Sequence, residues 1–143
     1  MTAVVVVDAS MAVKWVLPEE GHAEAMRLLE RYRNEDATLI APHLLLAEAG
    51  NTFWKLARRG ILTEAQATAA FHHLLENSPI LMESSRIASS ALQLALAHRQ
   101  TLYDCLYLAL ALDQQCDLVT ADRRFFGGIH LAFPFVQLLG NLD

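Results

Sequence analysis

Short apolar runs alternate with amphipathic segments along most of the chain. The first run, Thr2 to Val7, is rich in valine and stops at Asp8. Runs of this length that are apolar on both faces are typical of buried parallel strands. The sequence predicts four such strands, over residues 2–7, 37–41, 80–83 and 117–120, and a weaker fifth over 131–136. Pro134 places the fifth at an edge of the sheet, because proline cannot donate a hydrogen bond to a neighbouring strand.

The segments between these runs have helical spacing of apolar residues and recognisable helix ends. Helices are predicted over 11–17, 22–33, 42–59, 63–77, 84–98 and 104–115, with a turn over 123–126 before two glycines. The end signals are Ser10 as a cap of the first helix, Pro42 as the start of the third, Gly60 as its stop, Thr63 with Gln66 as a capping box, and Ser84 or Ser85 as a cap of the fifth. Strands separated by helices favour an α/β fold in which helices flank a central, mainly parallel β-sheet of four to five strands.

Length and composition predict one folded domain over residues 1–143. The chain is 54% hydrophobic and 19% charged, which excludes a disordered polypeptide. No apolar run reaches the length of a membrane span and no basic leader precedes the first run, so we expect a cytoplasmic protein without a membrane partner. On one helix, Cys105 and Cys116 would lie about 16 Å apart, too far for a disulfide, and we interpret both as packing residues on one buried helix face.

The formal net charge of −5 argues against a protein that holds nucleic acid by bulk electrostatics alone. A phosphate-bearing substrate would have to meet positive charge locally. The candidate cations are Lys14, Lys55, Arg58, Arg59, Arg99, Arg123 and Arg124, of which Arg58 and Arg59 also suit the end of a helix.

Four acidic residues occupy positions that favour a shared site. Asp8 and Asp122 follow predicted strands, and ligands collect beyond the carboxyl ends of parallel strands. Glu48 and Asp104 instead interrupt apolar helical segments, where an unpaired carboxylate is costly. Asp8 and Asp104 could alternatively cap helices and Asp122 could stabilise a turn, whereas Glu48 has no cap to make.

A divalent cation would relieve the repulsion within such a cluster. Carboxylate oxygens without accompanying histidine or cysteine suit Mg²⁺ or Mn²⁺ better than zinc, and the six histidines show no zinc-site spacing. The chemistry compatible with a carboxylate–metal cluster is phosphoryl transfer.

Four segments, residues 6–10, 46–51, 103–111 and 118–122, together resemble the PIN-domain ribonucleases, specifically the VapC-type toxins of toxin–antitoxin pairs. The resemblance implies a Mg²⁺- or Mn²⁺-dependent endoribonuclease that forms a homodimer and is inhibited by a VapB-type antitoxin. It also implies that Asp8 and Asp104 are the principal metal ligands and that Glu48 and Asp122 complete the acidic pocket.

Three further residues are candidates for a supporting role. Thr120 and Ser10 match family positions beside the acidic pocket, although a backbone cap is an equal alternative for Ser10. Asn51 lies one helical turn after Glu48 and could face the same pocket. The alanine- and leucine-rich stretch 88–97 fits burial against a second subunit, against an antitoxin helix, or in the protein's own core.

Other classes of protein share parts of this pattern. A haloacid-dehalogenase-like phosphatase also begins with an aspartate after a strand, but it needs a second aspartate where this chain has Ser10. A receiver-like signalling domain needs adjacent acids near the first strand and a late lysine, which this sequence lacks. The remaining alternatives are a different Mg²⁺-dependent phosphoryl hydrolase and a catalytically inactive interaction module with the same fold.

Overall fold

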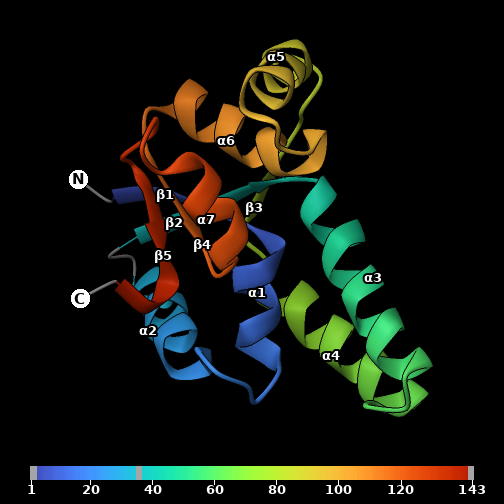
Figure 1. The fold of residues 1–143 in the computed structure, drawn as a ribbon. Helices are drawn as coiled ribbons and strands as arrows, with labels where there is room; N and C mark the ends of the chain where they lie inside the picture. The colour runs from blue at the N-terminus through green and yellow to red at the C-terminus, as the bar shows by residue number, and fades with distance from the viewer. Residues whose placement is uncertain (1–2, 35–36, 142–143) are drawn as a thin grey trace.

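A five-stranded parallel β-sheet forms the centre of the computed structural model, which describes residues 3–34 and 37–141 (Figure 1). The strands are β1 Ala3–Val7, β2 Ala37–Pro42, β3 Ile80–Met82, β4 Asp117–Thr120 and β5 Val136–Leu138. Their order across the sheet is β3-β2-β1-β4-β5, and every neighbouring pair is parallel. The predicted α/β class is therefore confirmed.

Helices cover the sheet on both sides (Figure 1). They are α1 Ala9–Val16, α2 His22–Arg33, α3 Leu44–Arg58, α4 Glu64–Glu76, α5 Ala88–His98, α6 Leu102–Gln114 and α7 Arg123–Ile129, and the short 3-10 helix η1 Leu139–Asn141 follows β5. α6 packs across β1, β2 and β4, and α5 packs on α6. Val6 and Val7 point to opposite faces of β1 and are both fully buried, as expected for a central strand covered on both faces. No helix in the described residues is long and apolar enough to cross a membrane.

The sheet order creates a switch point at the carboxyl ends of β1 and β4. From β1 the chain builds outward through β2 and β3, then crosses to the other side of β1 to form β4 and β5. β1 pairs with β4 in the register Val6 to Leu118 and Val7 to Val119. Side chains that follow β1 and β4 are therefore brought together at the edge where ligands bind in open α/β sheets.

Several predicted element ends are confirmed. Gly60 adopts a positive φ of 73° after α3, a conformation that glycine reaches without strain. The capping box of α4 is complete, because Thr63 accepts from the Gln66 backbone and the Gln66 side chain accepts from the Thr63 backbone. Thr2, which the sequence assigned to the first strand, lies outside the described residues.

Other predicted ends are wrong. Pro42 does not open α3 but ends β2, paired with Met82. Neither Ser84 nor Ser85 caps α5, which begins at Ala88; the Ser85 hydroxyl instead donates to Glu83 at 2.6 Å. Ser10 is not the cap of α1, because the helix starts at Ala9.

The last part of the chain also differs from the prediction. The expected turn over 123–126 is the first part of α7, which continues through both glycines to Ile129. Phe125 and Ile129, one turn apart, are buried and anchor this helix. Residues 131–135 consequently form the turn that follows α7, and the last strand begins only at Val136, at the edge of the sheet.

The two cysteines do not share a helix face. Cys105 is buried in α6, but that helix ends at Gln114, and Gln115 adopts a left-handed conformation. Cys116 follows this residue and is half-buried in the connection to β4. Both thiols are free, and burial raises the pKa of Cys105 to about 11, so its reactive thiolate form is suppressed.

Candidate active site

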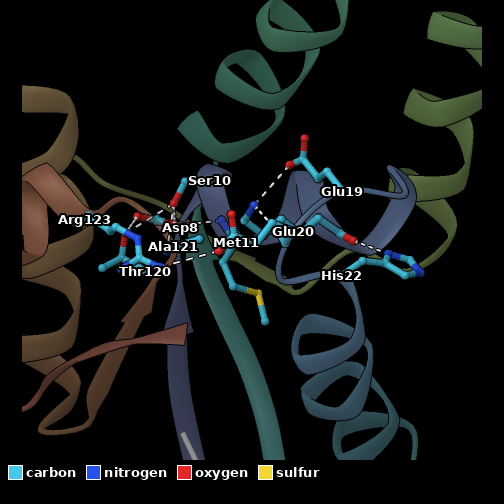
Figure 2. A network of polar contacts seen from close by, with 10 residues as sticks. Asp8, Ser10, Met11, Glu19, Glu20, His22, Thr120, Ala121 and Arg123 are labelled. Atoms are coloured by element: carbon cyan, nitrogen blue, oxygen red, sulfur yellow. Dashed lines mark hydrogen bonds and ion pairs between the residues drawn. The ribbon is translucent and has the colours of Figure 1, made fainter. Parts of the chain in front are cut away.

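Asp8 lies at the switch point and is the most buried of the four acids. It directly follows β1 and is only 6% exposed. Its Oδ1 accepts from the Ser10 hydroxyl at 2.7 Å and from the Met11 backbone at 3.0 Å, so Asp8 also caps α1 (Figure 2). The Thr120 hydroxyl donates to the other oxygen, Oδ2. Neutral donors therefore hold both oxygens of Asp8 in place.

Thr120 and Ser10 link Asp8 to the segment that follows β4. The Thr120 side chain is fully buried, and its hydroxyl accepts from the Asp122 backbone at 3.0 Å. The Ser10 hydroxyl accepts from the Ala121 backbone, also at 3.0 Å. The structure thus places both residues beside Asp8, where they join the ends of β1 and β4 (Figure 2).

Glu48 is held by a residue that the sequence interpretation did not single out. Glu48 is half-buried on α3, and its Oε1 accepts from the Tyr107 hydroxyl at 2.7 Å. Tyr107 lies on α6, one turn after Asp104, and its side chain is 1% exposed. The spacing of three residues from Asp104 was a signal that could have pointed to it.

Asp104 and Asp122 lie at the starts of two helices. Asp104 is half-buried in the first turn of α6, and its backbone donates to Thr101 Oγ1 at 3.1 Å. Thr101, not Asp104, is therefore the cap of α6. Asp122 does cap its helix, because its Oδ1 accepts from the backbones of Arg124 and Phe125 at 3.0 and 3.1 Å.

Asn51 is not joined to these residues. Its side chain is exposed on α3 and makes no hydrogen bond with any other residue that the structure describes. Three aromatic side chains differ in their burial. Trp15 and Phe53 belong to the core, whereas Trp54 is exposed and lies against the guanidinium of Arg58.

The four carboxylates influence one another electrostatically. Burial, with a smaller contribution from the charge of Asp104, raises the pKa of Asp8 to about 6 against the lowering effect of its hydrogen bonds. Burial also raises the pKa values of Glu48 and Asp104, with added repulsion from Asp104 on Glu48 and from Asp122 on Asp104. We call Asp8, Glu48, Asp104 and Asp122 the acidic centre.

Positive charge near the acidic centre is limited. None of the ion pairs among the described residues includes one of its four acids. Lys14 contacts Glu19 at 3.3 Å, and Arg123 lies 3.6 Å from Glu20, on the turn between α1 and α2 (Figure 2). Arg124 forms no ion pair with a described residue, and its charge lowers the pKa of Asp104. Most of the negative charge is thus uncompensated.

The donor set fits a hard divalent cation. No three histidine, cysteine, aspartate or glutamate side chains among the described residues are grouped closely enough to hold a metal ion, as a zinc site would require. Mg²⁺ is commonly bound through only one or two carboxylates and otherwise keeps water or substrate oxygens. The carboxylate of Asp8, which is buried and held by neutral donors without a cationic partner, suits this kind of binding.

A parallel sheet with acidic residues at its switch point defines the class to which this chain belongs. Residues 5–127 match the family model described as PIN domain, and the chain is a member of the PIN-domain family. Within that family it is of the VapC type.

Three relatives carry VapC names. Ribonuclease VapC3 of Pyrobaculum aerophilum is 35% identical over 83% of this chain and 89% of its own length. Ribonuclease VapC1 of Mycobacterium tuberculosis is 33% identical over 83% of this chain and 86% of its own. Exonuclease VapC9 of P. aerophilum is 33% identical over 70% of this chain and 74% of its own. The crystal structure of PAE2754 from the same archaeon is 26% identical, with a TM-score of 0.67 over 90% of this chain and 87% of that one.

Proposed function

We propose that this protein is a Mg²⁺- or Mn²⁺-dependent endoribonuclease that acts as the toxin of a toxin–antitoxin pair. The observation that carries the proposal is the acidic centre, in which burial raises the pKa values of Asp8, Glu48 and Asp104 and the charge of Asp104 acts on the other two, without an ion-pair partner among the described residues. The VapC ribonucleases to which the chain is similar support RNA as the substrate. All four acids are present, which argues against an inactive interaction module.

In this proposal Asp8 and Asp104 hold the metal ion, and Glu48 and Asp122 complete the site. The ion would supply an activated water and stabilise charge on the scissile phosphate. Ser10 and Thr120 fix the carboxylate of Asp8, since each donates to a different oxygen. In this proposal Glu48 would accept a proton from the attacking water, and burial, which raises its pKa, would make it a better proton acceptor.

The partners follow from the same proposal. A VapB-type antitoxin would inhibit the enzyme, the active form would be a homodimer, and the RNA substrate places the activity in the cytoplasm. The outer face of α5 supports a partner-binding surface, because Leu92 and Leu96 are 50% and 74% exposed on a helix without acidic residues, lysine or arginine.

The direct test is cleavage of a circular RNA by the purified chain. We expect linear products with Mg²⁺ or Mn²⁺ and none with EDTA, and an exonuclease would leave the circle intact. Asp8→Asn and Asp104→Asn should each lower the rate by more than about 100-fold, because each removes a proposed metal ligand. Asp117→Asn, an exposed aspartate at the opposite end of β4, is the matched control and should cleave like the wild type.

Two outcomes would contradict the proposal. Cleavage at the wild-type rate by both variants would show that the acidic centre does not catalyse it, and a wild-type chain that leaves a panel of structured RNAs intact would favour the interaction module. Growth arrest on expression, relieved by Asp8→Asn, would separately test the toxin assignment.

A further inference from the structure

The hydrogen bond between Tyr107 and Glu48 connects α6 to α3 at the acidic centre. The two residues are 59 positions apart in sequence, and the bond length is 2.7 Å. Only Oε1 of Glu48 is used; no donor among the described residues contacts Oε2. One oxygen of Glu48 is therefore fixed by the protein and the other is left for a ligand or water.

The phenol is a permanent donor in this setting. Burial and the charge of Glu48 raise the pKa of Tyr107 well above that of a free phenol, so the hydroxyl stays protonated. The charges of Asp8 and Asp104 also reach this hydroxyl. It lies within the electrostatic range of three acids of the centre.

A neutral donor has a different effect from a cation at the same place. An arginine would orient Glu48 but would also cancel its charge and weaken the attraction for a divalent ion. A phenol orients the carboxylate and leaves its charge in place. Neutral donors also orient the carboxylate of Asp8, since its side-chain partners are the hydroxyls of Ser10 and Thr120.

We propose that Tyr107 is a positioning residue that holds Glu48 in the orientation used to bind the divalent ion or the water it carries. The inference rests on the proposed metal-dependent function and adds a residue to it. Hydrogen-bond partners of metal-binding groups typically change metal affinity or activity by about 10- to 100-fold when they are removed.

The test is a double-mutant cycle on Mn²⁺ binding, measured without RNA by titration calorimetry or by the electron paramagnetic resonance of free Mn²⁺. Tyr107→Phe removes one oxygen atom and keeps the packing of the ring. We expect it to weaken Mn²⁺ binding by about tenfold in the wild-type background. In the Glu48→Gln background it should have no further effect, because the group through which it acts is already altered. Tyr32→Phe, on α2, removes the same atom away from the acidic centre and should change nothing.

Two results would overturn the inference. One is unchanged Mn²⁺ affinity in Tyr107→Phe, and the other is an equal loss in both backgrounds, which would indicate a general structural role. The fate of the proposed function is read separately from cleavage. If the wild type cleaves RNA and Tyr107→Phe cleaves it equally well, only the inference is refuted. If the double-mutant cycle on Mn²⁺ binding gives the expected result but the wild type cleaves no RNA, only the proposed function is refuted.

A second measurement needs no substitution at Tyr107. The chain has three tyrosines, so 3-fluorotyrosine labelling gives three fluorine resonances, and Tyr32→Phe and Tyr103→Phe assign the third by elimination. Mg²⁺ should shift the Tyr107 resonance and leave that of Tyr32 in place. A Tyr107 resonance that does not respond to saturating Mg²⁺ counts against the inference.

Discussion

At the residue scale, Asp8 shows how a functional group is kept charged at a cost to stability. Its side chain is almost completely buried, and its partners are neutral donors that lower the pKa less than burial raises it. Without metal, the carboxylate of Asp8 therefore binds a proton more strongly in the folded chain than in the unfolded chain. An ion bound at the acidic centre would reverse this balance, because it favours the charged form.

This balance predicts a pH-dependent effect of Asp8→Asn on the metal-free chain. The pKa of Asp8 is 3.8 in the unfolded reference and about 6 in the folded chain. The contribution of Asp8 to stability is therefore complete below pH 3.8 and is lost as the pH rises through about 6. At pH 7 the loss amounts to about 3 kcal/mol, and Asn, which does not ionise, avoids it. Urea unfolding in EDTA should show Asp8→Asn gaining stability relative to the wild type between pH 4 and pH 7.

The control for this measurement is Asp117→Asn, which replaces an exposed aspartate on β4. Its stability difference from the wild type should stay flat over the same pH range. A flat difference for Asp8→Asn as well would show that the buried carboxyl is compensated in a way that the hydrogen bonds of Ser10, Met11 and Thr120 do not reveal.

At the element scale, local signals predicted the helices and strands, and tertiary contacts decided where several of them end. The stop at Gly60 and the capping box at Thr63 depend only on neighbouring residues and were predictable. The continuation of α7 through two glycines was not, because burial of Phe125 and Ile129 against the rest of the protein outweighs the low helix propensity of glycine.

The residues at the acidic centre also differ in how far the sequence alone could predict them. Asp8, Glu48, Asp104 and Asp122 could be singled out because each carboxylate stands against an apolar sequence or at a strand end. Tyr107 was missed, because a tyrosine among leucines and alanines is typical of a core residue. Its spacing of three residues from Asp104 indicated only a shared helix face, and its partner lies on another helix. Only the packing of α6 near α3 shows that its hydroxyl meets Glu48.

The caps of two helices allow a matched prediction. Thr101 caps α6 through the backbone of Asp104, and Thr63 caps α4 through the backbone of Gln66. Thr101→Ala and Thr63→Ala should each cost about 1 kcal/mol of stability in urea unfolding. Only Thr101→Ala should also lower RNA cleavage, by about tenfold, because it loosens the turn that carries Asp104. Equal cleavage by the two variants would mean that the position of Asp104 does not depend on this cap.

At the scale of the whole molecule, the negative charge of the protein and its proposed substrate have to be reconciled. The chain carries a formal charge of −5, and two of its cations near the site are occupied by Glu19 and Glu20. One or two divalent ions at the acidic centre would change the formal charge to −3 or −1 at the place where a phosphate must lie. Arg124, which has no ion-pair partner among the described residues, is positioned to add to this local positive potential.

RNA binding should therefore depend on a divalent ion even when no bond is cut. Ca²⁺ has the same preference for oxygen ligands as Mg²⁺, and its looser geometry suits a binding measurement without turnover. We expect fluorescence anisotropy to show RNA binding at least tenfold tighter in Ca²⁺ than in EDTA at matched ionic strength, because a bound ion acts on phosphate at short range. The gain should shrink in the Asp8→Asn, Asp104→Asn double variant, which lacks the proposed ligands. Equal affinity in Ca²⁺ and EDTA would show instead that the exposed arginines bind RNA without help from the acidic centre.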